Sequence, residues 1–263
     1  MKFTYYDQTM DLFAKEYFPD GPPQKIVISC SGGLDSSGLL YLACKYFPEV
    51  EKHIFTGHNP KGPFESLNAQ DVVSWIEDNI PNHNIQSHDI LEYDDTSDEI
   101  LAEAKQLVDN DPSYFDKYPW IDRGNEKDSW KHFLEKIAKP ISNTKNIRSI
   151  MRKYECKRYI AAMTQNPPND VMEKLGFAHL AETKRNEDQN TVHVFNRDGI
   201  SYHPFARVNK LFVKGIYETH DLMGEYYNLT GSCTGNYDLT NYFTKPCGKC
   251  FWCHEKKWAF GEC

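Results

Sequence analysis

Residues 25–37 read Lys25-Ile26-Val27-Ile28-Ser29-Cys30-Ser31-Gly32-Gly33-Leu34-Asp35-Ser36-Ser37 and decide the fold expected for this chain. The stretch opens with a short β-branched run, which is typical of a buried strand in a parallel sheet. A Gly-Gly turn follows, and the residues from Ser36 to Phe47 place apolar side chains at helical spacing. A strand, a tight turn and a helix in this order predict the first unit of an α/β fold.

The same alternation continues after this stretch. We expect a second strand over His53–Thr56, a second helix over Glu65–Ile80 and a third strand over Asn84–Ile90. Alternating short strands and helices imply right-handed crossovers, so we predict a doubly wound parallel sheet covered by helices on both faces. Further expectations are a helix over Tyr5–Phe18, an inner strand over Arg158–Met163, an antiparallel pair around Val192–Phe195 and Asn196–Gly199, and a helix over Phe205–His220.

The turn after the first strand has the composition of an anion-binding site. Its glycines let an anionic group approach the backbone, and the following helix offers the positive end of its dipole. Asp35 would repel a bare phosphate, so we expect it to hold Mg²⁺ that bridges phosphate oxygens. The alternative is an ordinary strand-to-helix turn in which Asp35 or Ser36 only caps the helix. The residues expected to bind the phosphates are Ser29, Ser31, Gly32, Gly33, Leu34, Asp35, Ser36 and Ser37.

The hexapeptide Ser31-Gly32-Gly33-Leu34-Asp35-Ser36 resembles the S-G-G-x-D-S signature of the PP-loop ATP pyrophosphatases. It is neither a Walker A loop nor a dinucleotide fingerprint, because G-x-x-x-x-G-K-[ST] and G-x-G-x-x-G are both absent. The resemblance implies a fold like that of the adenine nucleotide α-hydrolases, with ATP bound over the loop. It also implies that a substrate attacks the α-phosphate and that pyrophosphate leaves.

Four of the eight cysteines lie close together near the C-terminus, in the arrangement Cys233-x13-Cys247-x2-Cys250-x2-Cys253. Four thiolates suit a tetrahedral Zn²⁺ ion, and C-x-x-C spacing lets two ligands come from one turn. An iron–sulfur cluster or a redox pair uses similar spacings. The pattern favours a structural zinc site over either alternative.

A PP-loop followed by a terminal four-cysteine site resembles the 7-cyano-7-deazaguanine synthases (QueC). Two segments carry the likeness at the cysteines: Gly231-Ser232-Cys233 and Cys247-Gly248-Lys249-Cys250. A third, His203-Pro204-Phe205 followed by Lys210, resembles a proline-started helix whose lysine enters the active site. The resemblance implies the catalytic residues Asp35, Ser36 and Lys210, and conversion of a ring carboxylate to an amide and then a nitrile with ATP and ammonia. A solvated helix lysine is the alternative reading of Lys210.

The net charge of −8 is unevenly distributed. Residues 89–128 hold thirteen acidic and four basic side chains, a balance of −9, so the rest of the chain is close to neutral. This disfavours a protein that tracks nucleic-acid phosphates, without excluding a small basic patch. No apolar run reaches the roughly 20 residues of a membrane helix, and the N-terminus lacks the pattern of a signal peptide, so we expect a cytoplasmic protein.

The chain is expected to divide into an ATP-binding α/β domain over residues 1–220 and a zinc-binding segment over 221–263 packed on it. Its expected partners are a small-molecule substrate and ammonia, and a homodimer is compatible with the sequence. Two other functions stay open. One is a PP-loop enzyme that modifies tRNA or a nucleotide, in which Cys30 or the C-terminal thiols would be reactive, and the other is a nucleotide-binding partner protein without turnover.

Overall fold

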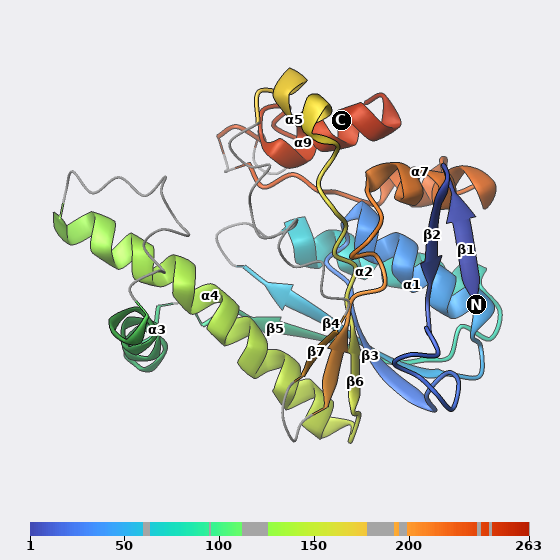
Figure 1. The fold of residues 1–263 in the computed structure, drawn as a ribbon, viewed down its shortest axis with the longest axis horizontal. Coiled ribbons are helices and arrows are strands. Elements are labelled where there is room, and N and C mark those ends of the chain that lie inside the picture. The colour runs from blue at the N-terminus through green and yellow to red at the C-terminus, as the bar shows by residue number, and fades with distance from the viewer. Residues whose placement is uncertain are drawn as a thin grey trace.

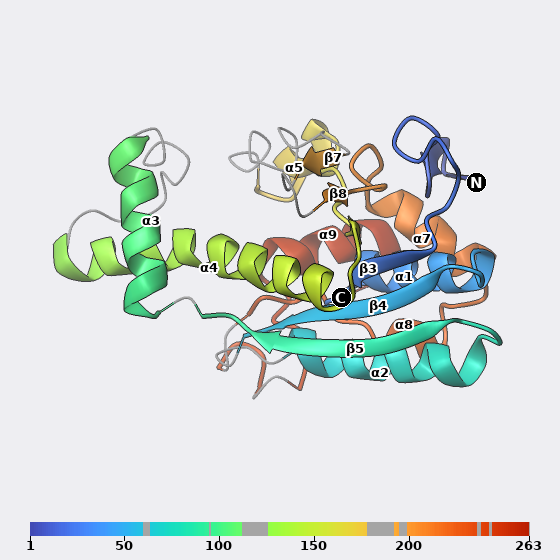
Figure 2. The ribbon, with the colours of Figure 1, turned by 90° about the horizontal axis from the view of Figure 1, so that it is seen from below.

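The structure is a computed structural model that describes residues 1–59, 64–94, 96–111, 126–177, 192–194, 199–235, 238–241 and 244–262. A twisted sheet lies between layers of helices, as Figures 1 and 2 show. The strands are β1 (Lys2–Tyr5), β2 (Gln8–Asp11), β3 (Lys25–Ser29), β4 (Glu51–His58), β5 (Ile85–Glu92), β6 (Arg158–Ile160), β7 (Val192–Val194) and β8 (Ile200–Tyr202). The helices are α1 (Leu34–Tyr46), α2 (Phe64–Asn79), α3 (Asp98–Asn110), α4 (Glu126–Lys153), α5 (Asn169–Lys174), α7 (Lys210–Thr219), α8 (Glu225–Asn228) and α9 (Phe251–Phe260).

The main sheet has the strand order β5-β4-β3-β6-β8-β7. Every neighbouring pair is parallel except β7 and β8, which are antiparallel. The chain therefore runs outward from β3 through β4 to β5 and then returns to β6 on the other side of β3. This reversal makes the carboxyl ends of β3 and β6 the place where open α/β sheets bind ligands.

The side chains of β3 explain why the sheet needs cover on both faces. Ile26 and Ile28 are buried in the large core that contains residues of α1, α2 and α7. Val27 points the other way, into a smaller core with residues of α4. Successive strand residues alternate between faces, so one apolar strand is buried by two helix layers. The predicted doubly wound parallel sheet is confirmed.

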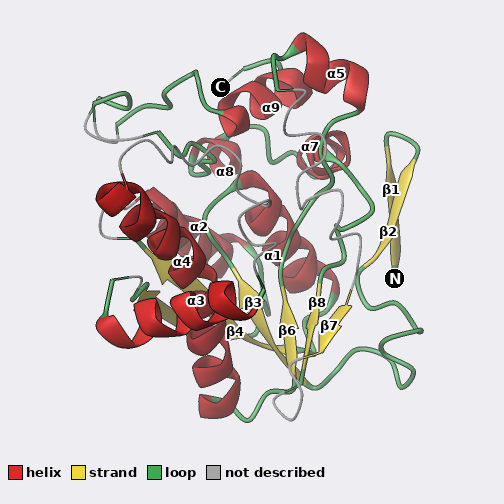
Figure 3. Cartoon of the chain, turned by 60° about the vertical axis from the view of Figure 1, so that its left-hand side comes forward, coloured by secondary structure: helices red, strands yellow, loops and turns green. Residues whose placement is uncertain are grey.

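The expected helix over Tyr5–Phe18 is wrong. Residues 2–11 form the β1–β2 hairpin instead, and turns follow it; the hairpin stands beside α7 and apart from the main sheet (Figure 3). Tyr6 and Asp7 have φ values of +49° and +59°, which suits a two-residue turn that matches the strand twist. Phe3 and Met10 pair across the hairpin and are both buried. Tyr6 stands at helical spacing from Met10 and Phe13 in the sequence, but it is an exposed turn residue.

The expected helix over Phe205–His220 begins later than predicted, at Lys210. Asn209 caps it, because its side-chain oxygen accepts a hydrogen bond from the backbone N–H of Leu211. Pro204 therefore does not start this helix. The predicted antiparallel pairing is confirmed by β7 and β8, although most of the predicted turn, residues 196–198, lies outside the described residues.

The acidic region splits between described and undescribed residues. Helix α3 packs through Ile100, Ala104 and Val108 against the first half of α4, in an apolar cluster separate from the sheet. Figures 1 and 2 show both helices reaching beyond the sheet. Lys145 of α4 pairs with Glu99 and Glu103 of α3. Residues 112–125, with the aromatic part of the acidic region, lie outside the described residues, as does Cys263.

Candidate functional site

The Gly-Gly turn lies at the carboxyl end of β3 and begins helix α1. Gly33 is the N-cap residue, and no side chain caps the helix by a hydrogen bond. The first N–H that bonds back into the helix is that of Ser37, which donates to Gly33 O at 2.9 Å. The N–H groups of a first helical turn have no partner within the helix, so this turn presents them and the dipole toward a ligand.

Two serine hydroxyls hold the bend in shape. Ser36 Oγ donates to Gly33 O at 3.1 Å and accepts from the backbone N–H of Ser31, also at 3.1 Å. The hydroxyls of Ser31 and Ser36 lie 3.1 Å apart. The structure thus brings together Ser31, Gly33 and Ser36 as the sequence predicts. Ser29 ends β3, whereas Leu34 and Ser37 are buried beneath the bend and can offer a ligand only backbone groups.

Gly32 is required by geometry. Its φ is +69°, and a Cβ added there would lie 2.4 Å from the backbone N of Ala69 and 2.5 Å from the Cβ of Asn68. The bend is therefore pressed against helix α2. Backbone atoms cannot move aside as a flexible side chain can, so any residue larger than glycine would push the loop out of place.

We expect Gly32→Ala to destabilise the chain more than Gly176→Ala. Gly176 also has a positive φ, +78°, but a Cβ there meets nothing within 4 Å. The matched variant measures the left-handed strain alone, about 1–2 kcal/mol. Gly32→Ala should cost a further ~1–3 kcal/mol from overpacking and should weaken ATP binding. Urea unfolding and calorimetric titration of both variants check this, and equal losses would show that the bend is not confined by α2.

Asp35, in the first turn of α1, is paired with Lys210. Lys210 Nζ donates to the two carboxylate oxygens at 2.6 and 2.7 Å. Thr164 Oγ1 donates to Oδ2 at 3.2 Å, from the segment that follows β6. Glu255 of α9 lies on the same lysine, 3.5 Å from Nζ. Lys210 is not a solvated helix lysine, since its side chain is only 3% exposed.

A pocket of about 350 Å³ opens over this pair and the bend. Its basic side chains are Lys210 and Lys139, the second from α4. Its other wall comes from the segment that leads into the cysteine group. The lining residues are Ser31, Gly33, Leu34, Asp35, Ser36, Lys139, Ala162, Lys210, Gly231, Ser232, Cys233, Thr234 and Trp252.

One backbone hydrogen bond joins the bend to the cysteine segment. Gly231 N donates to Gly32 O at 2.9 Å, two residues before Cys233. Gly231 also packs closely against helix α2, because a Cβ added to it would lie 2.2 Å from Asn68 Nδ2. A ligand that held Cys233 in position would therefore also hold residues 231–234, which form this wall of the pocket.

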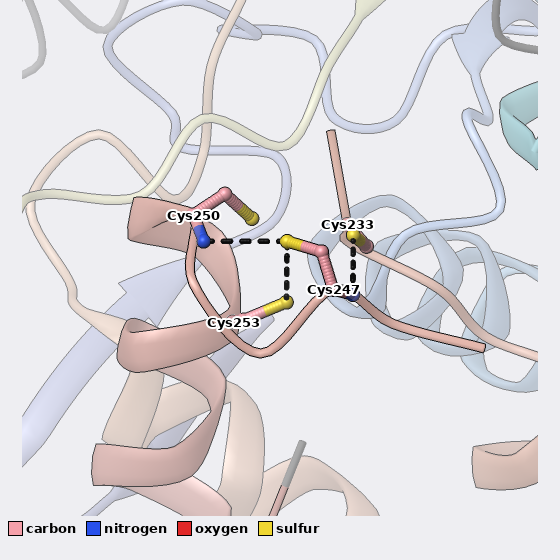
Figure 4. A group of neighbouring side chains, drawn as sticks. All are labelled: Cys233, Cys247, Cys250 and Cys253. Carbon is pink, nitrogen blue, oxygen red and sulfur yellow. Dashed lines mark hydrogen bonds between the residues drawn. The ribbon is translucent and has the colours of Figure 1, made fainter. Parts of the chain in front are cut away.

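The four cysteines predicted to bind metal come together (Figure 4). The Sγ atoms of Cys233, Cys247, Cys250 and Cys253 all lie within 4.8 Å of one another. Those of Cys247 and Cys253 are 3.9 Å apart. Four sulfurs at about 2.3 Å from one Zn²⁺ would be about 3.8 Å apart, so the donor set fits a single tetrahedral ion.

Backbone N–H groups surround two of these sulfurs. Cys233 Sγ accepts from the N–H groups of Gly235 and Cys247, at 3.3 and 3.2 Å. Cys247 Sγ accepts from those of Lys249 and Cys250, at 3.5 and 3.3 Å. Burial opposes ionisation of Cys247, but these two N–H groups and the neighbouring thiols of Cys233 and Cys250 lower its pKa to about 7. Burial raises the pKa of the Cys233 and Cys253 thiols, so Cys247 is the cysteine readiest to supply thiolate, the form that binds metal.

Cys30 is not a reactive thiol in this fold. It is fully buried beneath the bend, and desolvation raises the pKa of its thiol to about 11. Thiolate is the nucleophilic form, so Cys30 would be almost wholly protonated near neutral pH. It behaves as a small apolar side chain of the core.

Three residues at or beside the pocket were not found from the sequence: Lys139 lines the pocket, Thr164 bonds to Asp35, and Glu255 pairs with Lys210. Thr164 follows the inner strand β6, so its position at the carboxyl edge of the sheet was a usable signal. Glu255 lies in a helix that contains a cysteine ligand and had no motif of its own. Lys139 lies in the long helix α4, and its position beside the pocket depends on how α4 packs against the rest of the chain.

No family model and no curated protein matches the sequence. Among solved structures, the U34-tRNA thiolase NcsA from Methanococcus maripaludis, which carries a [4Fe-4S] cluster, is 13% identical with a TM-score of 0.48, covering 95% of this chain and 73% of that one. The NMN synthetase from Francisella tularensis is 13% identical with a TM-score of 0.40, covering 95% and 82%. Both TM-scores are below 0.5, so neither likeness bears on what this chain does.

In the part of the chain that the structure describes, no helix combines the length and the apolar content that a membrane span requires.

Proposed function

We propose that this chain is a PP-loop ATP pyrophosphatase that adenylylates a small carboxylate substrate and then transfers ammonia to it. One observation supports this most: an uncapped helix N-terminus and the Asp35–Lys210 pair face one pocket at the strand-order reversal. That place suits a nucleotide. The S-G-G-x-D-S sequence supports ATP over other nucleotides by its resemblance to the PP-loop signature.

The bend would bind the β- and γ-phosphates. The N–H groups of the first turn of α1 donate to phosphate oxygens, and the helix dipole favours their negative charge. The hydroxyls of Ser31 and Ser36 line the same pocket and can turn to donate as well. Lys210 and Lys139 add positive charge where pyrophosphate would leave.

Asp35 can hold Mg²⁺ at the phosphates. A carboxylate has about four acceptor positions, and Lys210 and Thr164 occupy three of them. Mg²⁺ is usually bound by one or two carboxylates together with substrate phosphates and water, so the remaining position suits it. When bound, the ion would neutralise charge on the phosphates.

The proposed acceptor is 7-carboxy-7-deazaguanine, or a related ring carboxylate. Its carboxylate oxygen attacks the α-phosphorus, the bond to the β-phosphate oxygen breaks, and pyrophosphate leaves. Ammonia then attacks the acyl carbon of the adenylate, AMP leaves, and a proton is lost to give the amide. A second ATP can activate the amide oxygen in the same way, with pyrophosphate leaving, after which loss of AMP and of both amide protons gives the nitrile.

The proposed metal of the cysteine group is Zn²⁺ in a structural role. Four protein sulfurs fill a tetrahedral ion and leave no position for a substrate. Its contribution would be to fix Cys233, and through Gly231 the wall of the pocket. The division at residue 220, the cytoplasmic location and the homodimer stay predictions.

The proposal is tested by incubating the chain with ATP, ammonium and 7-carboxy-7-deazaguanine and measuring the products. We expect AMP and pyrophosphate to form in equal amounts, together with amide or nitrile. ADP and phosphate in their place would contradict the scheme. ATP binding without pyrophosphate, across a range of carboxylates, would instead support a partner protein without turnover.

A sulfur-transfer enzyme is the second class that this experiment separates. It would give AMP and pyrophosphate with a thiolated product rather than an amide. Cys30 cannot serve as its sulfur carrier while it is buried with a raised pKa. The assay is therefore also run with a sulfide donor in place of ammonium.

A further inference from the structure

Three charged side chains meet beside the pocket, one from each of three helices. Asp35 lies in α1, Lys210 is the first residue of α7, and Glu255 lies in α9. All three are shielded from solvent, with side-chain exposures of 18%, 3% and 1% in that order. Asp35 and Lys210 have roles in the proposed reaction, and Glu255 has none so far.

The geometry around the lysine shows how the two carboxylates differ. Asp35 takes two short hydrogen bonds from Nζ, at 2.6 and 2.7 Å. Glu255 stands farther off, at 3.5 Å, which is an ion-pair distance rather than a good hydrogen bond. An ammonium group has three N–H donors, so one remains for another acceptor.

A bound nucleotide would change this balance. Asp35 would have to share its charge with a metal ion that bridges the phosphates, and its hold on Lys210 would weaken. Burying an ammonium group costs free energy unless a carboxylate pairs with it. With a single counter-ion that is shared with a metal, the lysine side chain would also be held less firmly. A second carboxylate at ion-pair distance keeps the lysine in place.

We propose that Glu255 is a positioning residue for adenylylation, which holds Lys210 in the pocket while Asp35 serves the metal and the phosphates. This inference rests on the proposed function and assigns Glu255 a part in it. Glu255 stands two residues after Cys253, in a helix whose N-cap is Cys250. The cysteine group thus sets the place of Glu255, and through it that of Lys210.

The test is a double-mutant cycle on Glu255→Gln and Lys210→Met. Glutamine keeps the shape of the side chain and removes its charge. If Glu255 acts only by packing, E255Q should therefore behave like the wild type. We expect E255Q to lower kcat for pyrophosphate release about 10- to 100-fold, with the KM for ATP nearly unchanged. In the K210M background, E255Q should change kcat little, because its effect passes through the lysine.

A second readout of the same cycle needs no nucleotide. In the wild-type chain, E255Q removes a counter-ion from a buried lysine and should lower the urea midpoint. In the K210M chain, which has no cation at this position, E255Q should lower the midpoint less. A smaller shift in K210M supports the pairing, and equal shifts in both backgrounds would overturn it.

The matched control is Glu218→Gln, on the exposed side of α7, where Glu218 pairs with Lys214. It makes the same chemical change in the same helix as Lys210 and should leave kcat unaltered. Zinc content per chain is measured for every variant, so that loss of the metal cannot pass for loss of positioning. If E255Q does not fold, E255D keeps the charge at a longer distance. A reduced kcat with full zinc then supports the inference, and a wild-type kcat overturns it.

The failure of this inference can be told from that of the proposed function. A wild-type chain that releases no pyrophosphate overturns both. A wild-type chain that does so beside an equally active E255Q overturns the role of Glu255 alone.

Discussion

Replacing Asp35 by asparagine is expected to reduce pyrophosphate release about 100- to 1,000-fold, the usual effect of removing one electrostatic contact to a transition state. The neutral amide attracts Mg²⁺ far less, and its single oxygen can accept only one of the two short hydrogen bonds from Lys210. Glu255 remains beside the lysine, so the variant should still fold. The measurement is steady-state release of pyrophosphate at saturating ATP, with ATP binding followed by calorimetry.

The matched control for this prediction is Asp109→Asn. Asp109 is an exposed residue of α3 that pairs with Lys105 one helical turn away. Exposed pairs of this kind contribute little to stability, and this one has no contact with the pocket, so its activity should equal that of the wild type. Equal activity of Asp35→Asn and the wild type would show that the carboxylate has no part in the chemistry, and the nucleotide scheme would fail with it.

Removing the metal is expected to have the other large effect. Chelation, or Cys253→Ser, should abolish stoichiometric zinc and lower the melting temperature by about 10 °C or more. Structural zinc contributes several kcal/mol to folding, and each kcal/mol moves the midpoint of a chain of this size by about 2–4 °C. ATP affinity should fall as well, because the hydrogen bond from Gly231 to Gly32 depends on the placement of Cys233. Metal analysis, calorimetry and thermal unfolding check the three effects.

Cys263→Ser is the control for this experiment, because Cys263 stands outside the spacing pattern Cys233-x13-Cys247-x2-Cys250-x2-Cys253 in the sequence. It should keep one zinc per chain and the wild-type melting temperature. An iron content instead of zinc, with the absorption of a cluster, would contradict the tetrahedral single-ion assignment. Full ATP affinity in the metal-free chain would show that the pocket wall holds without the cysteine group.

The strand, bend and helix of residues 25–46 could be predicted because each follows from local preference. A β-branched run, two glycines and helical spacing stand next to one another in the chain, and neighbouring residues set the backbone angles. The hairpin at the N-terminus could not be predicted in this way. Its two turn residues, Tyr6 and Asp7, have positive φ values. Glycine and asparagine are the usual signals of such a turn, and neither occupies these positions.

In the candidate site, too, some residues could be found from the sequence and others could not. The loop serines and glycines and the four cysteines were found because the distances between them along the sequence are short or conform to a ligand spacing. Lys210 was found by resemblance, but its burial against Asp35 was not. Glu255 gave no sequence signal at all, because an acidic residue in an amphipathic helix is usually on the surface.

Local sequence preferences were enough to predict the strand, Gly-Gly bend and helix of residues 25–46, and the spacing of four cysteines that can hold a metal. Tertiary packing alone places Lys210 between Asp35 and Glu255, beside the pocket. The physical reason is that side-chain periodicity shows which face of a helix is apolar, but not which other helix will cover it. That choice depends on how α1, α7 and α9 pack beside the sheet, and it is made by contacts between residues far apart in the chain.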